Sequence, residues 1–216
     1  MKRIVHSVAA AILAAFSIGP SVAADAGTLE PAILSGDAGA VRAALAAGAD
    51  PNEIFPVYDT SALMLAAIRG DGAMVLTLLA AGADPNWING RGYNALSAAA
   101  RSCRAGWDVA AALLDAGADI DNRSGARLTP LMVAIQEERP SFFRGLVAHG
   151  ADINAVNAYG EGALNYAIYY RQPEYIATLL DRDVETAPLR NLFQGLYTYY
   201  YPNFGDARPQ AVDCAT

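Results

Sequence analysis

The chain has 216 residues, a length that suits one domain of ordinary size. Its 15 basic and 22 acidic side chains give a formal net charge of −7. This balance argues against nucleic acid as a partner, because binding to a phosphate backbone favours clustered basic groups. After residue 24 no apolar run is long enough to cross a bilayer, so we expect no membrane span in the mature chain.

The first 24 residues have the pattern of a signal peptide. Lys2 and Arg3 precede an apolar run over residues 8–18, Pro20 ends that run, and the small residues 22–24 form a cleavage site. This pattern predicts export to the periplasm of a Gram-negative bacterium, or secretion from such a cell. An amphipathic or membrane-anchoring first helix is the alternative, although the run is too short to span a bilayer.

Removal of the signal peptide would change the charge of the protein. The mature chain would keep 15 − 2 = 13 basic side chains, all of them arginine, and a net charge of 13 − 22 = −9. An acidic surface favours a basic partner and speeds its capture.

Two sets of residues recur along the chain with nearly the same period. The first is a glycine that heads a Gly-Ala-Asp triplet, with spacings of 34, 35 and 33 residues: Gly48, Gly82, Gly117 and Gly150. The second is a leucine, with spacings of 33, 35 and 33 residues: Leu63, Leu96, Leu131 and Leu164. Because two independent markers keep the same period, the sequence predicts a solenoid of stacked units.

Each unit is expected to contain two helices and an extended finger. Glycine can adopt the left-handed conformation that ends the outer helix, and the aspartate that follows suits the turn. We therefore assign Asp84, Asp119 and Asp152 to turns and not to pairs of catalytic carboxylates. Further along each repeat, a residue suited to cap a helix precedes the inner helix: Ser61, Asn94, Thr129 and Gly162.

These markers divide the chain into three parts. Residues 1–24 form the signal peptide, residues 25–185 the repeat domain, and residues 186–216 a C-terminal cap with a tyrosine-rich tail. The expected repeats are 28–50, 51–84, 85–119, 120–152 and 153–185.

Three departures from the repeat pattern are expected. The opening repeat has no finger, and Asp37 is placed to cap its outer helix. The finger of the second repeat is one residue longer than the later ones, and the third repeat has two extra residues between its helices, near Cys103.

The tail after the last repeat has apolar residues at helical spacing from Leu189 to Tyr200, which predicts a helix that covers the end of the stack. The alternative is that its remaining tyrosines form part of a binding surface: Tyr197, Tyr199 and Tyr201.

The repeats resemble those of the ankyrin family. The fourth repeat follows the family pattern of Gly-Ala-Asp and Thr-Pro-Leu-His-x-Ala with these residues: Gly117, Ala118, Asp119, Thr129, Pro130, Leu131 and Ala134. The family's histidine is replaced in each copy: Met64, Ser97, Met132 and Asn165. The resemblance covers roughly residues 28–185 and implies an all-α ankyrin-repeat solenoid with β-hairpin-like fingers, about five repeats and a C-terminal capping helix.

The resemblance also implies where a partner would dock. In such stacks the fingers and the exposed faces of the inner helices line a concave surface, and partners are usually proteins. Carried over to this chain, the finger positions are Phe55, Tyr58, Trp87, Arg91, Tyr93, Leu128, Tyr159 and Glu161, and the inner-helix positions are Arg69, Arg101, Gln136, Glu137 and Tyr169. Aromatic and arginine side chains are common at interface hot spots, although several of these aromatic residues could instead pack finger against finger.

Nothing in the sequence indicates catalysis, a metal site or a cofactor. After the signal peptide only His149 remains, at the end of an outer helix, where it is expected to cap the helix. One histidine and two distant cysteines do not form a zinc or nucleophile constellation. We expect an exported protein-binding module, with two jobs open: an immunity protein that neutralises a toxin, or an accessory protein of the cell envelope. An architectural spacer and an unrecognised enzyme are the alternatives, and the oligomeric state is left open.

The two cysteines of the chain, Cys103 and Cys214, could be joined. In an oxidising compartment an even pair favours a disulfide, which here would tie the tail to the third repeat. Two free or separately buried thiols, and a redox or intermolecular use, are the alternatives.

The bridge predicts the outcome of a thiol count. The exported protein, denatured without reductant, should show no reaction with a thiol reagent and two reactive thiols after reduction. Two reactive thiols before reduction would contradict the bridge.

Overall fold

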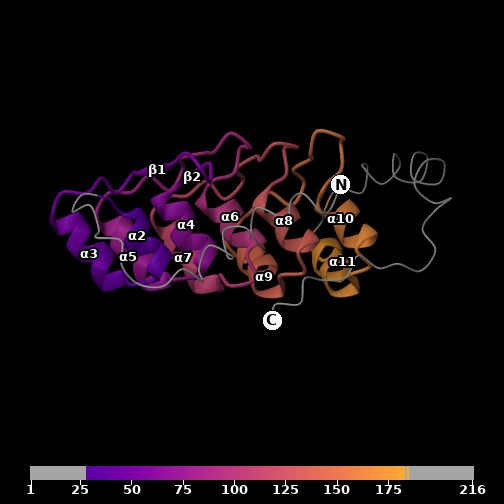
Figure 1. Ribbon diagram of the computed structural model, residues 1–216. Coiled ribbons are helices and arrows are strands. Elements are labelled where there is room, and N and C mark those ends of the chain that lie inside the picture. The colour runs from indigo at the N-terminus through magenta and orange to yellow at the C-terminus, as the bar shows by residue number, and fades with distance from the viewer. Residues whose placement is uncertain (1–27, 183, 185–216) are drawn as a thin grey trace.

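The computed structural model describes residues 28–182 and 184, and these form an elongated stack of helix pairs (Figure 1). The inner helices are α2 (Glu30–Ser35), α4 (Ala62–Arg69), α6 (Ala95–Arg101), α8 (Pro130–Gln136) and α10 (Ala163–Tyr169). The outer helices are α3 (Ala38–Ala46), α5 (Gly72–Ala80), α7 (Trp107–Asp115), α9 (Pro140–Ala148) and α11 (Pro173–Leu180). The predicted signal peptide, the predicted C-terminal cap and Cys214 lie outside the described residues.

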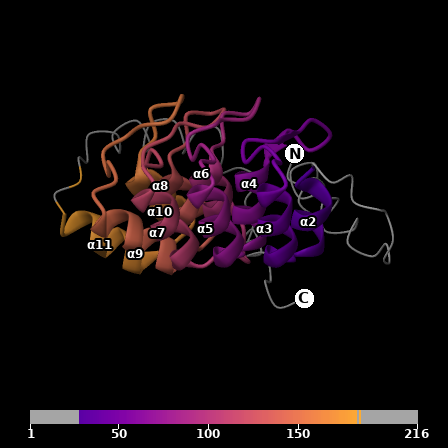
Figure 2. The ribbon, with the colours of Figure 1, turned by 90° about the vertical axis from the view of Figure 1, so that its left-hand side faces the viewer.

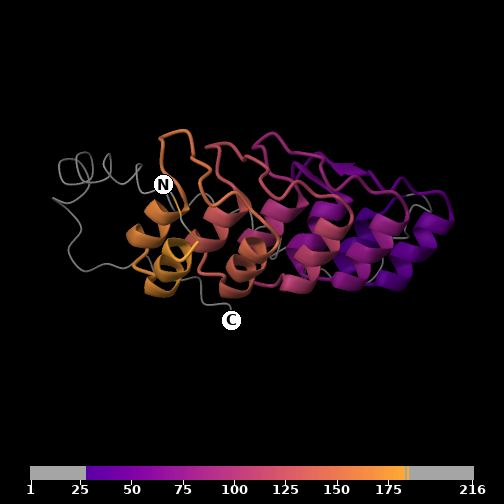
Figure 3. The ribbon, with the colours of Figure 1, turned by 180° about the vertical axis from the view of Figure 1, so that it is seen from behind.

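The helices lie in two rows, with the fingers along one edge of the stack (Figures 2 and 3). Along the inner row α4 contacts α6, α6 contacts α8 and α8 contacts α10, while α3, α5, α7 and α9 make the corresponding contacts in the outer row. This arrangement confirms the predicted all-α solenoid. The first finger also contains an antiparallel pair of short strands, β1 (Ile54–Phe55) and β2 (Thr60–Ser61).

The ends of the helices are formed by the residues that the pattern predicts. After α5, Gly82 adopts a φ of 93°, which only glycine takes without strain. At the start of the inner helices, Ser61 Oγ accepts the amide of Met64 at 3.2 Å and Asn94 Oδ1 accepts the amide of Ser97 at 2.9 Å. These caps satisfy amides that have no partner within the helix.

The core is continuous along the stack, and the leucines of the repeat pattern belong to it. All four leucines of the repeat pattern are at most 2 % exposed: Leu63, Leu96, Leu131 and Leu164. Full burial of such a side chain contributes about 1.5–3 kcal/mol relative to exposure. Phe142 and Phe143 of α9 are fully buried as well, and Phe143 stacks on Tyr175 with ring centroids 4.2 Å apart.

The family's missing histidine is replaced by local polar contacts in two of the repeats. Ser97 Oγ donates to Asn94 Oδ1 at 2.8 Å, and Asn165 Oδ1 accepts the amide of Gly162 at 3.0 Å. The start of each of these inner helices therefore keeps a polar tie without histidine.

A row of side-chain amides joins successive turns after the outer helices. Asn52 Oδ1 accepts the amide of Asp84 at 2.7 Å, and its Nδ2 donates to the carbonyl of Gly82 at 3.2 Å. Asn86 repeats this bridge one unit later, with 2.7 Å to the amide of Asp119 and 2.8 Å to the carbonyl of Gly117. Each asparagine thus supplies both the acceptor and the donor that the next turn along the stack needs.

A second set of hydrogen bonds joins the repeats at the opposite end of the inner helices. Arg69 Nη1 donates to the carbonyl of Leu34 at 3.1 Å, and Gln172 Nε2 donates to the carbonyl of Ile135 at 3.0 Å. Arg139 makes the equivalent contact with the carbonyl of Ala105. The two sets of hydrogen bonds therefore join neighbouring units of the stack at two separate places.

The insertion in the third repeat is confirmed. Residues 102–106 connect α6 to α7, whereas two residues, 70–71, connect α4 to α5. The inserted loop folds back on the second repeat, because Ser102 Oγ donates to the carbonyl of Ile68, and Gly70 leaves no room for a side chain next to the carbonyl of Arg104. Cys103 is exposed on this loop, so its bridge to Cys214 stays a prediction.

Within the part of the chain that the structure describes, no helix has the length and apolar character of a membrane span.

The first prediction from the fold concerns Asp121, which stands where the neighbouring repeats have an asparagine bridge. Its Oδ1 accepts the amide of Asp152 at 2.9 Å, but a carboxylate cannot donate to the turn carbonyl as an amide does. We therefore expect Asp121→Asn to raise the free energy of unfolding by about 0.5–1.5 kcal/mol at neutral pH, measured by denaturant titration.

The gain should shrink in acid. Burial raises the pKa of Asp121, the Asp152 amide lowers it, and the carboxylates of Asp152 and Asp119 raise it further. The native state therefore holds this proton more tightly than the unfolded chain, and the cost of ionised Asp121 disappears as the pH falls through the raised pKa. The reverse change in the neighbouring repeat, Asn86→Asp, should lower stability. Equal stability of all three proteins at neutral pH would contradict the role of the bridge.

The second prediction concerns Gly145 in the middle of α9. The ring of Trp107 lies against this glycine, 6.0 Å from the ring of Phe142 and 5.1 Å from that of His149 between centroids. A methyl group at residue 145 would push the ring away, so Gly145→Ala should destabilise the fold by about 1–3 kcal/mol despite the better helix propensity of alanine. The same change at the exposed turn of Gly39 in α3 should have a much smaller effect on unfolding.

Candidate binding surface

Four residues of the predicted docking surface form, with two further tyrosines, a group along the inner helices. We call it the inner surface, and its residues are Tyr93, Arg101, Glu137, Tyr166, Tyr169 and Tyr170. Tyr93 comes from the second finger, Arg101 is the last residue of α6, and Glu137 caps α8. Tyr166 and Tyr169 belong to α10, and Tyr170 is the residue that follows it.

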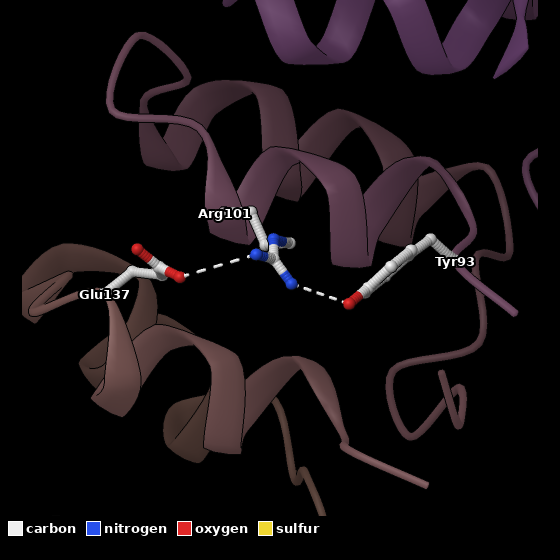
Figure 4. Close-up of polar contacts among 3 residues, drawn as sticks. All are labelled: Tyr93, Arg101 and Glu137. Atoms are coloured by element: carbon white, nitrogen blue, oxygen red, sulfur yellow. Dashed lines mark hydrogen bonds and ion pairs between the residues drawn. The ribbon is translucent and has the colours of Figure 1, made fainter. Parts of the chain in front are cut away.

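Arg101 is the centre of the first half of the inner surface (Figure 4). Its Nη1 donates to the hydroxyl of Tyr93 at 2.6 Å, and its Nη2 lies 3.9 Å from Oε1 of Glu137. The guanidinium carbon also lies 5.2 Å from the centre of the Tyr93 ring. The hydrogen bond and the ring hold the guanidinium in place, while the ion pair is too long to add much.

The side chains of Arg101 and Glu137 keep 26 % and 21 % of their surface exposed. A partner can therefore reach both charges without breaking the contact with Tyr93. An arginine that is already ordered loses less conformational entropy on binding than a free one.

Three tyrosines form the second half of the inner surface. The rings of Tyr166 and Tyr170 stack with centroids 6.2 Å apart, and Tyr169 meets Tyr170 edge to face at 5.0 Å. The hydroxyl of Tyr166 accepts a hydrogen bond from Asn157 Nδ2 at 3.1 Å. The cluster therefore couples α10 to the fourth finger.

Burial governs the protonation of these tyrosines. It raises the pKa of Tyr166 to about 12, against the hydrogen bond from Asn157 and with the help of the Glu161 charge. Burial also raises the pKa of Tyr170, helped by Tyr169, Tyr166 and the negative charge of Glu137. Both hydroxyls stay neutral at physiological pH, so both can act as hydrogen-bond donors.

Several predicted residues do not lie on an open surface. Phe55 is 2 % exposed and belongs to the core, so its side chain does not lie on the surface where the sequence placed it. Tyr58 and Leu128 are half-buried against the core. Arg69 is engaged by the carbonyl of Leu34, and desolvation lowers its pKa, although Asp71 raises it.

The remaining predicted residues are accessible to different degrees. Tyr159 and Tyr169 are 80 % and 43 % exposed, and Arg91 is exposed as well. Trp87 and Gln136 are half-buried, and Glu161 accepts a hydrogen bond from Asn157 at 2.9 Å. Their part in binding stays a prediction.

Sequence reasoning missed two sets of accessible or clustered side chains. Tyr166 and Tyr170 stand four residues apart on one helix face, a spacing that could have shown them to be neighbours. The exposed apolar residues of the first two fingers are Ile54, Val57 and Ile88, not the aromatic residues next to them. The repeat pattern of the sequence does not indicate which side of a finger faces solvent.

The described residues contain no group of three or more side chains that could hold a metal ion. His149 is the residue after α9, and its Nδ1 lies 2.8 Å from the carbonyl of Gly145, as expected for a side chain that caps a helix.

Comparison with known families and proteins agrees with the geometry. The family model of ankyrin repeats, in three copies, matches residues 29–124 and 103–187. A search among curated proteins gives no match. The matched residues cover most of the chain and include every described helix. The chain belongs to the ankyrin repeat family, whose members are generally protein-interaction modules.

Proposed function

We propose that this chain is an exported protein-binding module that holds its partner on the inner surface. The observation that supports this most is the placing of two ordered clusters on helices that contact each other: Arg101 contacts Tyr93 and Glu137 at the end of α8, and Tyr170 contacts Tyr166 and Tyr169 of α10. Tyrosine and arginine are the side chains most often found at the centres of protein interfaces.

The chemistry of the surface also favours recognition over catalysis. Ordered hydroxyl and guanidinium donors stand beside exposed aromatic rings, an arrangement that supplies contact area together with directed hydrogen bonds. Hydrogen bonds between successive turns and from the end of the inner helix α4 join neighbouring units of the stack. A partner would therefore meet a surface whose backbone is already in place, which reduces the entropy lost on binding.

The proposed location is the periplasm or the outside of a Gram-negative cell, and it rests on the pattern of residues 1–24. Two jobs fit an exported ankyrin protein: neutralisation of a toxin as an immunity protein, and support of another envelope protein as an accessory factor. Both require a stable protein partner, so the identity of the captured partner decides between them.

The test is capture of the partner and its loss in a matched variant. The full chain, purified after export, is used to capture proteins from its own envelope extract, and the partner is identified by mass spectrometry. We expect Tyr169→Ala to weaken the partner's affinity at least tenfold, because the truncation removes a large ring that is 43 % exposed on the inner surface.

The control is Leu76→Ala, which removes a 58 % exposed side chain from the outer helix α5. It should leave affinity unchanged, and all variants should melt within a few degrees of the natural protein. Equal losses in the control and in the tyrosine variant would contradict the inner surface as the site. Failure to capture any stable partner would favour the architectural spacer.

A further inference from the structure

The tips of the second, third and fourth fingers form a single ridge, because hydrogen bonds join each tip to the next. The amide of Gly125 donates to the carbonyl of Arg91 at 2.6 Å, and the amide of Ala158 donates to the carbonyl of Ala126 at 3.0 Å. We call residues 89–92, 124–127 and 157–160 the finger-tip ridge. Its order along the edge of the stack can be followed in Figure 3.

The three tips are built on the same turn. In each, an amide closes the turn on the carbonyl three residues earlier: Gly92 to Asn89, Arg127 to Ser124, and Gly160 to Asn157. The closing residue has a positive φ in every case, 78° at Gly92, 58° at Arg127 and 78° at Gly160. The third finger thus places an arginine where its two neighbours have glycine.

An arginine in this position has an energetic cost. A side chain with positive φ is strained, and backbone strain of this kind tends to accumulate at functional sites. The side chain of Arg127 gains nothing inside the fold that offsets the cost: it is exposed, and among the described residues it has no hydrogen bond or ion pair. The fold alone would be better served by glycine at residue 127.

The neighbours of Arg127 extend the positive charge and add an aromatic ring. Arg91 and Tyr159 occupy the turn position just before the closing residue in the second and fourth tips, and both are exposed. Ala126 holds the same position in the third tip, so only a small side chain separates them. Arg123 lies at the base of this tip, with its Nη1 on the carbonyl of Val156 at 2.9 Å.

The acidic groups near the ridge are engaged in hydrogen bonds to the fold. Asp59, on the first finger, accepts the amide of Gly90 at 3.1 Å, and Glu161 accepts Asn157 Nδ2 at 2.9 Å. In the described part of the chain neither forms an ion pair with an arginine. The side chains of Arg91 and Arg127 are therefore exposed on the same ridge as Tyr159.

We propose that the finger-tip ridge, through Arg91 and Arg127, binds a carboxylate-rich segment of the protein partner, with Tyr159 packing on that segment. This deepens the proposed function and rests on it. The net charge of the whole chain favours a basic partner, but charges more than about 8 Å away are screened at physiological salt. The local arginines therefore decide which side chains can lie against the tips, and guanidinium groups match carboxylates in geometry as well as charge.

The test uses a defined probe, so it does not depend on the native partner. A fluorescein-labelled peptide of alternating glutamate and tyrosine is titrated with the full chain, and a peptide with glutamine in place of glutamate serves as its neutral counterpart. The variants are Arg127→Gly, Arg91→Gln with Arg127→Gly, and the control Arg42→Gln with Arg144→Gln. The control removes two exposed arginines from the outer helices α3 and α9.

The natural protein should prefer the glutamate peptide to its glutamine counterpart. Arg127→Gly should weaken its binding severalfold and the double finger-tip variant about tenfold, since each exposed arginine–carboxylate pair is worth at most about a factor of five. The control should stay within a factor of two. The melting temperature of Arg127→Gly should equal or exceed that of the natural protein, because the strain at residue 127 is removed.

Other outcomes would overturn the inference. They are equal affinity for the two peptides, equal losses in the control and finger-tip variants, or a melting temperature that falls when Arg127 becomes glycine. Tighter binding of an oligothymidylate of matched charge, with the same dependence on Arg91 and Arg127, would also overturn it, because the ridge would then recognise phosphate. Failure of the peptide experiment leaves the inner surface standing as the partner's site, whereas loss of the inner-surface effect leaves the peptide result unchanged.

Discussion

Contact between neighbouring repeats is the interaction on which the rest of the structure depends. No helix pair of this chain can bury its apolar face alone, so the repeats share a continuous core to which leucines such as Leu96 and Leu131 belong. Two rows of hydrogen bonds then fix how each repeat aligns with the next. One row runs through Asn52 and Asn86, and the other runs through Arg69, Arg139 and Gln172. Apolar burial supplies most of the stability, and the polar rows determine how the repeats align.

This arrangement separates residues that hold the stack from residues that face a partner. The leucines, the helix caps and the turn amides make their contacts within or between repeats. The finger side keeps side chains that the stack does not require, among them Tyr159, Tyr169 and Arg127. Arg127 is the sharpest case, since the turn in which it lies would be more relaxed with glycine.

The periodic features could be predicted from the sequence because the same pattern of residues occurs in several repeats. The helix caps at Ser61 and Asn94, the stop at Gly82 and the insertion near Cys103 all follow from spacing and residue type. The faces of the fingers could not be predicted in this way. A finger is short and irregular, so Phe55 turned into the core while its neighbour Ile54 stayed 46 % exposed. The hydrogen bonds between finger tips join residues over 30 positions apart, and no local sequence pattern predicts them.

In the proposed binding mode the partner contacts the fingers and the ends of the inner helices, while the outer helices only support them. Amide hydrogen exchange of the full chain, with and without its captured partner, tests this most directly. We predict slower exchange on binding at residues 89–93, 124–128 and 157–161 and near the ends of α6, α8 and α10, with no change in α5, α7 and α9. Slower exchange confined to the outer helices would contradict it.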